Sequence, residues 1–101
     1  MECDTAGKTK YVTFIYEFFG TGLILYAINV SYGNPIAVIF TILAAVLICG
    51  PITGAHFNPA VSTACLISHT TPKEALPMFF LMVVAEILGA LFGTFMSYFS
   101  L

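Results

Sequence analysis

Charged side chains are scarce in this chain of 101 residues. Lys, Arg, Asp and Glu together make up 8% of it, and the basic residues are three lysines, Lys8, Lys10 and Lys73. The chain has no basic run and no interleaving of basic and aromatic residues, the patterns that nucleic-acid binding requires. Nucleic acid is therefore dropped as a partner.

Metal-binding and catalytic patterns are lacking as well. The two histidines, His56 and His69, lie thirteen positions apart, which is not a spacing typical of a metal site. No neighbouring nucleophile and base suggest a catalytic site. The sequence thus predicts a protein that is not an enzyme and uses neither a metal ion nor a cofactor. An intramembrane enzyme or proton carrier built on Glu17, His56 and Glu86 stays open as an alternative.

Hydrophobic residues dominate instead. They make up 59% of the chain, and the mean hydropathy is +1.00. A water-soluble domain of this size could not hide so much apolar surface. The composition therefore predicts an integral membrane protein surrounded by the lipid bilayer.

Three apolar segments are predicted to span the membrane as helices, namely residues 11–32, 35–49 and 75–98. The first would be about 33 Å long as a helix, enough to cross the hydrocarbon core. A secretory signal is the competing interpretation of this segment, but the segment is too long and lacks a cleavage pattern. Pro35 suits the first turn of the second span, and Gly50 with Pro51 is expected to end it.

Residues 52–67 are too short and too interrupted to cross the bilayer. The positive-inside rule places all three lysines in the cytoplasm, so this segment must enter the membrane and return to the same side. We therefore expect an all-α membrane protein with three transmembrane helices and one re-entrant half-helix. Residues 1–10 would form a cytoplasmic N-terminal tail, and residues 11–101 one domain.

The re-entrant segment contains the motif GAHFNPAVS, residues 54–62. Residues 54–57 are expected to be extended, because the motif contains a flexible glycine and leads into a proline. Asn58 is then a favoured N-cap and Pro59 a favoured first residue of a short helix. The carbonyls before the turn could accept hydrogen bonds and the Asn58 amide could donate one, an arrangement that suits neutral molecules bearing hydroxyl groups.

This motif resembles the first NPA box of the aquaporin and aquaglyceroporin family, the major intrinsic proteins. Residues 17–21, EFFGT, resemble the signature of the family's first span, and residues 85–90, AEILGA, resemble that of its third. The resemblance implies a passive channel for water or small neutral solutes such as glycerol. It further implies six spans in two inverted repeats and assembly into a homo-oligomer, usually a tetramer.

The resemblance assigns roles to residues of the box. Asn58 would donate its amide hydrogens at the pore centre, and Pro59 and Ala60 would form the turn that positions it. The pore would further be lined by carbonyls of Gly54, Ala55, His56 and Phe57. For His56 the resemblance also implies an imidazole that faces the pore near its cytoplasmic mouth.

Three further positions follow from the same resemblance. Glu17 would hydrogen-bond the re-entrant loop and hold it in place. Glu86 is assigned the same supporting role, but the family usually has Gln there, and a buried acid needs a proton or a partner. Val38 would line the selectivity constriction, where an aromatic residue is usual, so a wider and less polar wall is expected.

The chain is similar to one repeat of the family and contains a single NPA box. A complete pore needs a second half, so we expect the chain to be the N-terminal half of a channel, either a partial product or one that associates with a second half-channel. The alternative is a non-conducting half-channel that associates with full-length relatives and modulates them. Small residues at Gly89 and Gly93 predict close helix contact on the third span.

Overall fold

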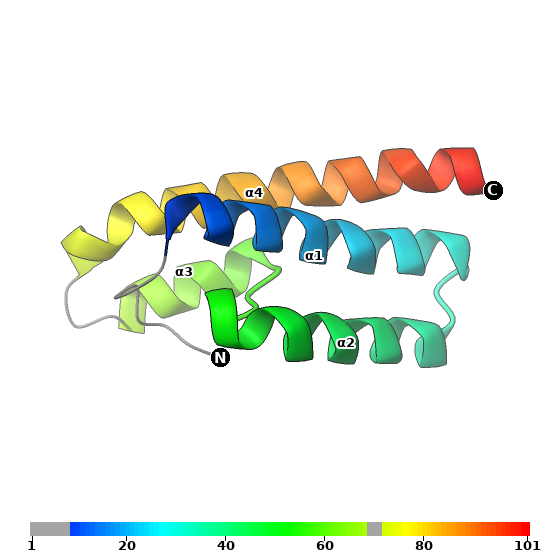
Figure 1. Cartoon of the computed structure of the whole chain (residues 1–101), viewed down its shortest axis with the longest axis horizontal. Coiled ribbons are helices and arrows are strands. Elements are labelled where there is room, and N and C mark those ends of the chain that lie inside the picture. The colour runs from blue at the N-terminus through cyan, green and yellow to red at the C-terminus, as the bar shows by residue number, and fades with distance from the viewer. Residues whose placement is uncertain (1–8, 69–71) are drawn as a thin grey trace.

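The computed structural model describes residues 9–68 and 72–101, which form four helices (Figure 1). The expected N-terminal tail and the loop before the third span fall largely on residues 1–8 and 69–71, outside the described residues. The helices are α1 (Lys10–Val30), α2 (Pro35–Thr53), α3 (Pro59–Ser68) and α4 (Pro72–Ser100). Three of them, α1, α2 and the Ala75–Ser100 part of α4, are long and apolar enough to cross a membrane. The predicted class, three spans and one half-helix, is confirmed.

Helix α2 begins where the sequence predicts and ends later. The side-chain oxygen of Asn34 accepts from the backbone N–H groups of Ile36 and Ala37, at 3.0 and 3.2 Å, and caps the helix ahead of Pro35. The expected end at Gly50 and Pro51 is wrong, because α2 continues to Thr53.

Two features near Pro51 explain the longer helix. Transmembrane helices tolerate proline, and in the last turn of α2 the hydroxyl of Thr53 donates to the carbonyl of Cys49 at 3.3 Å. The helix stops at Gly54, whose φ of 89° places it in the left-handed region that glycine adopts without steric cost.

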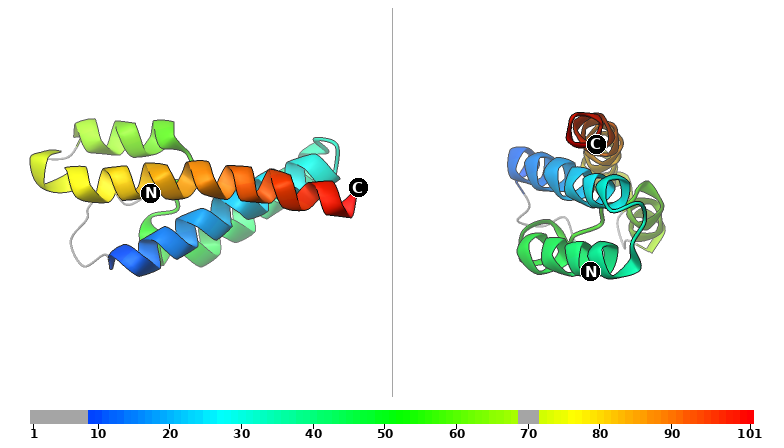
Figure 2. Two further views of the ribbon diagram at one scale, coloured as in Figure 1. Left: turned by 90° about the horizontal axis from the view of Figure 1, so that it is seen from above. Right: turned by 90° about the vertical axis from the view of Figure 1, so that its right-hand side faces the viewer.

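The helices form an open arc in the order α2, α1, α4, α3. Helix α1 packs against both α2 and α4, and α3 packs against α4, whereas α2 and α3 do not pack on each other. Figures 1 and 2 show that α1 and α4 run in the same direction along the molecule, while α2 and α3 run the opposite way. The chain therefore runs toward one end of the molecule in α2, turns back toward the middle, and runs toward the same end again in α3. This is the predicted re-entrant path.

Helices α1 and α4 approach each other through glycines. A Cβ atom on Gly89 would collide with the carbonyl oxygen of Phe18, and one on Gly93 would collide with the carbonyl oxygen of Gly22. In the other direction, a Cβ on Gly22 would lie 3.0 Å from the carbonyl oxygen of Gly89. The expected close contact at Gly89 and Gly93 is confirmed, and its partner is α1.

Candidate pore site

Helix α3 begins near the middle of the molecule (Figure 1). Its N-terminus is capped by Asn58, whose side-chain oxygen accepts from the backbone N–H of Ala60 at 2.9 Å. Pro59 is the first helical residue and needs no hydrogen-bond partner for its nitrogen. The predicted cap geometry is therefore present. The cap oxygen is engaged with the backbone, and the exposed Asn58 side chain keeps its amide group for other partners.

The backbone before Asn58 is not extended as expected. Ala55 and Phe57 have φ values of 52° and 53°, in the left-handed region, and they follow Gly54 at 89°. Each non-glycine residue in this region costs about 1–2 kcal/mol. Such strain persists only where the surroundings fix the backbone. The sequence offered no sign of it, because alanine and phenylalanine rarely adopt this conformation.

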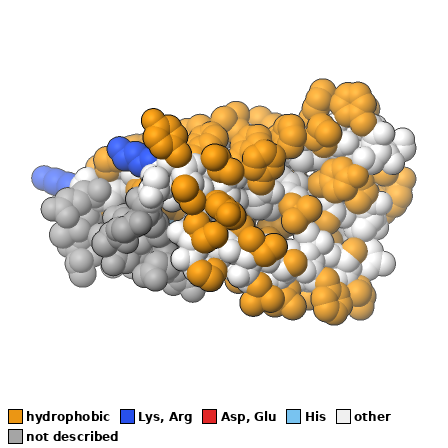
Figure 3. Space-filling view, viewed as in Figure 1, with side chains coloured by type: hydrophobic (Ala, Val, Ile, Leu, Met, Phe, Trp, Pro, Cys, Tyr) orange, Lys and Arg blue, Asp and Glu red, His pale blue; other side chains and the backbone are white. Residues whose placement is uncertain are grey.

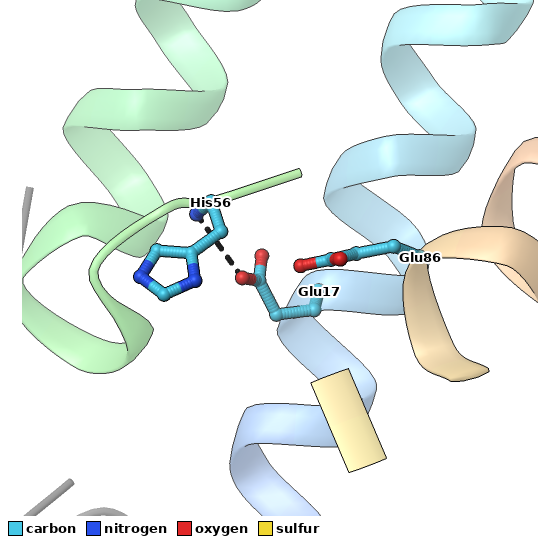
Figure 4. Close-up of side chains that lie close together, drawn as sticks. All are labelled: Glu17, His56 and Glu86. Carbon is cyan, nitrogen blue, oxygen red and sulfur yellow. Dashed lines mark hydrogen bonds between the residues drawn. The ribbon is translucent and has the colours of Figure 1, made fainter. Parts of the chain in front are cut away.

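Two side chains fix that strained segment. The hydroxyl oxygen of Thr53 accepts from the backbone N–H of Ala55 at 3.1 Å. The carboxylate oxygen Oε1 of Glu17, on α1, accepts from the backbone N–H of His56 at 3.1 Å (Figure 4). The Thr53 and Glu17 side chains are fully buried. The second contact is the one that the resemblance implies, and it joins positions 39 residues apart.

The imidazole of His56 is turned into the protein. The residue is 6% exposed in this chain alone, and its Nδ1 lies 3.0 Å from the hydroxyl of Ser62 on α3. Further protein around the chain could only lower that exposure. The imidazole thus presents little surface in this chain, and the backbone of His56 is the part of the residue that we expect to line a pore.

Glu86 has a hydrogen-bond partner that the sequence did not reveal. The hydroxyl of Ser62 lies 3.2 Å from Oε1 and 2.9 Å from Oε2 of Glu86, and all three atoms are buried. Glu86 on α4 therefore anchors α3, whereas Glu17 on α1 anchors the loop before it. Ser62 sits one turn into the half-helix, and only the fold shows that it faces α4.

The remaining predicted site residues lie apart from these anchors. The ring of Phe57 packs on α1, where a Cβ on Gly20 would collide with it. Val38 lies in the first turn of α2 and is partly exposed. The structure thus brings together the box and both glutamates but does not place Val38 against α3. A cavity of about 360 Å³ opens beside the box, lined among others by Thr21, Phe57, Asn58, Pro59, Glu86 and Ile87.

These features define a class of protein, a helical membrane protein with three spans and a re-entrant half-helix whose N-terminus is capped by Asn58 near the middle of the molecule. Comparison with known families makes the assignment specific. The family model described as major intrinsic protein matches residues 6–100. The chain belongs to the major intrinsic protein family, a family of channels and not of enzymes.

Several curated relatives match the chain. An aquaglyceroporin of Toxoplasma gondii is 34% identical over 89 residues, covering 81% of this chain and 33% of the relative. Aquaporin NIP3-1 of Arabidopsis thaliana is 35% identical, covering 75% of this chain and 27% of the relative. Aquaporin-2 of Talpa europaea is 38% identical over 88 residues, covering 80% of this chain and 74% of the relative. The chain thus spans about a third or less of the length of the first two. No solved structure matches it significantly.

Proposed function

We propose that the chain forms one half of a passive transmembrane pore for water or small neutral solutes such as glycerol. The observation that carries this proposal is the placement of Asn58, exposed at the N-terminus of a half-helix that starts near mid-molecule. Passage needs no covalent step, so the chain acts without a cofactor. The relatives' names, aquaporin and aquaglyceroporin, support this substrate class.

The electrostatics of the half-helix favour neutral solutes. A helix N-terminus carries a partial positive charge of about half an elementary charge. Directed at the middle of the membrane, that charge opposes cations. The Asn58 amide donates to a passing oxygen, and backbone carbonyls of residues 54–57 accept the solute's hydrogens. Val38 is smaller than the aromatic residue that is usual at the constriction. A pore lined by valine there would admit water and also larger neutral solutes.

The first prediction concerns conduction. Liposomes that contain the chain will shrink in stopped-flow light scattering faster than protein-free liposomes, in water and in glycerol gradients. Replacing Asn58 by alanine will remove most of that excess, because the amide donor at the pore centre is lost. Copies of the chain must associate for this result, since one copy supplies half of the pore lining.

Asn34→Ala is the matched control. Asn34 also caps a helix ahead of a proline, and either cap contributes about 1 kcal/mol to stability. Loss of conduction in both variants would therefore reflect folding and not the pore. Permeability at the lipid background for the unmodified chain would contradict self-sufficient conduction and favour the non-conducting, modulating half-channel.

The orientation proposal rests on the lysines. Lys10 begins α1 and Lys73 lies in the first turn of α4, and both are exposed at the same end of the molecule (Figure 3). The positive-inside rule then places the N-terminus in the cytoplasm.

Trypsin tests this orientation, because the chain has no arginine and three lysines. We expect cleavage after Lys73 in inside-out vesicles and none in sealed right-side-out vesicles, as read by mass spectrometry. Lys73→Gln is the control that must abolish that fragment. Cleavage in the right-side-out vesicles would reverse the assigned orientation.

A further inference from the structure

Three side chains with metal-binding atoms meet inside the protein. One ligand atom from each of Glu17, His56 and Glu86 lies within 4.8 Å of the other two, and all three residues are buried. Figure 4 shows the carboxyl group of Glu17 between the imidazole and the carboxyl group of Glu86. The residues come from α1, the loop before α3, and α4. Their wide separation in the sequence explains why spacing gave no sign of a metal site.

The charge of this cluster calls for a cation. Two carboxyl groups side by side in a low-dielectric interior cannot both be ionised without compensation. The basic residues of the described ranges, Lys10 and Lys73, are exposed and so lie outside the cluster. Clusters of acidic residues at protein surfaces are common without a bound ion. This cluster differs from them because all three of its residues are buried. The balancing charge is therefore a proton, on His56 or on a carboxyl group, or a metal ion.

The donor set fits a metal ion of one kind. Two carboxylate oxygens and one imidazole nitrogen form a ligand set that zinc takes in proteins, with a fourth position left for water. Ligand atoms around one zinc lie about 3.4 Å apart, as follows from bond lengths near 2.1 Å. The atoms of this cluster, within 4.8 Å of one another, would have to move closer to bind one ion. Both ring nitrogens of His56 have neighbours, because the hydroxyl of Ser62 lies 3.0 Å from Nδ1 and Sγ of Cys65 lies 3.6 Å from Nε2. A bound ion would replace one of these contacts, and the other would orient the ring as second partners of metal ligands do.

We propose that Glu17, His56 and Glu86 bind one divalent ion of the zinc class, which ties α1, the re-entrant loop and α4 together. The ion has a route inward, because Glu86 also lines the cavity of about 360 Å³ that opens beside Asn58. The site depends on Glu86 being an acid. With glutamine at position 86, the set would lose one anionic ligand and most of its affinity.

Cobalt(II) tests the site without any measurement of conduction. The chain, purified in detergent and stripped of metal with a chelator, is titrated with Co²⁺ while its visible absorption is recorded. We expect intense d–d bands that saturate at one ion per chain and vanish when Zn²⁺ is added. Glu86→Gln should weaken binding at least about tenfold. Glu74→Gln, which removes the same charge from the start of α4, should bind as the unmodified chain does.

Two results would overturn the proposal. One is the absence of saturable bands in the unmodified chain, which would leave protons as the balancing cations. The other is equal binding by Glu86→Gln and the unmodified chain. Circular dichroism checks that the Glu86→Gln variant folds, and if it does not, the titration of the unmodified chain decides alone. The cobalt titration does not depend on conduction. The metal-site proposal can therefore hold when the permeability assay fails, and the channel proposal can hold when the titration shows no binding.

Discussion

Replacing Gly89 by alanine will lower the free energy of unfolding by about 1–3 kcal/mol, the range for overpacked interiors. The added methyl group would strike the backbone carbonyl of Phe18. A backbone atom cannot move aside as the end of a flexible side chain can, so α1 and α4 must separate. Gly93→Ala should act in the same way against the carbonyl of Gly22. Unfolding in mixed micelles by added sodium dodecyl sulfate measures the effect.

Gly50→Ala serves as the control for these variants. Gly50 is helical, and a Cβ atom there would meet nothing within 4 Å. Alanine in a helix is favoured over glycine by about 0.5–1 kcal/mol, so this variant should be as stable as the unmodified chain or slightly more stable. Equal losses at Gly50 and Gly89 would show that the close approach of α1 and α4 is not what the glycines provide.

Replacing Glu17 by alanine will lower the free energy of unfolding by about 2–4 kcal/mol. The backbone N–H of His56 would lose its acceptor in a buried setting, and the missing side chain would leave a cavity. The strained left-handed residues on either side of His56 would then lose one of the two contacts that fix them. Hydrogen exchange at the His56 amide should accelerate at least about tenfold, because a loss of more than about 1.4 kcal/mol in the free energy of opening corresponds to a factor of ten in the exchange rate.

Glu17→Gln is the matched variant, because a glutamine oxygen can still accept from His56 and the side chain fills the same space. With a chelator present to remove metal ions, it should keep most of the stability and slow exchange at His56. If Glu17→Gln and Glu17→Ala exchange equally fast, the hydrogen bond is not what holds the loop. If neither differs from the unmodified chain, the neighbouring contact from Thr53 suffices.

The spans were predictable from the sequence, because apolar composition over about 20 residues is enough to identify a transmembrane helix. The end of α2 was not. Gly50 and Pro51 are typical of a helix end in water, where a broken hydrogen bond is replaced by solvent. Inside a membrane, α2 continues to Thr53, four residues past the predicted last residue 49, and the left-handed Gly54 ends it.

The candidate site was predictable only in part. The cap at Asn58 follows from local rules, since its hydrogen bond reaches two residues along the chain. The contact of Ser62 with Glu86 and the orientation of the His56 ring depend on how α3 docks on α4. Such contacts between distant residues leave no local pattern. The spacing of Glu17, His56 and Glu86 along the chain gave no sign of a metal site for the same reason.

The order of the helices in the arc has a consequence for biosynthesis. Helix α1 lies between α2 and α4, yet α4 is synthesised after α1, α2 and α3. The glycine surface of α1 at Gly22 and the carboxyl group of Glu17 therefore enter the membrane before the segments that cover them have been made. During that interval, lipid or the insertion machinery must cover a helix that already carries an acid at its centre. The speed at which α4 follows then limits how long this intermediate is exposed to quality control.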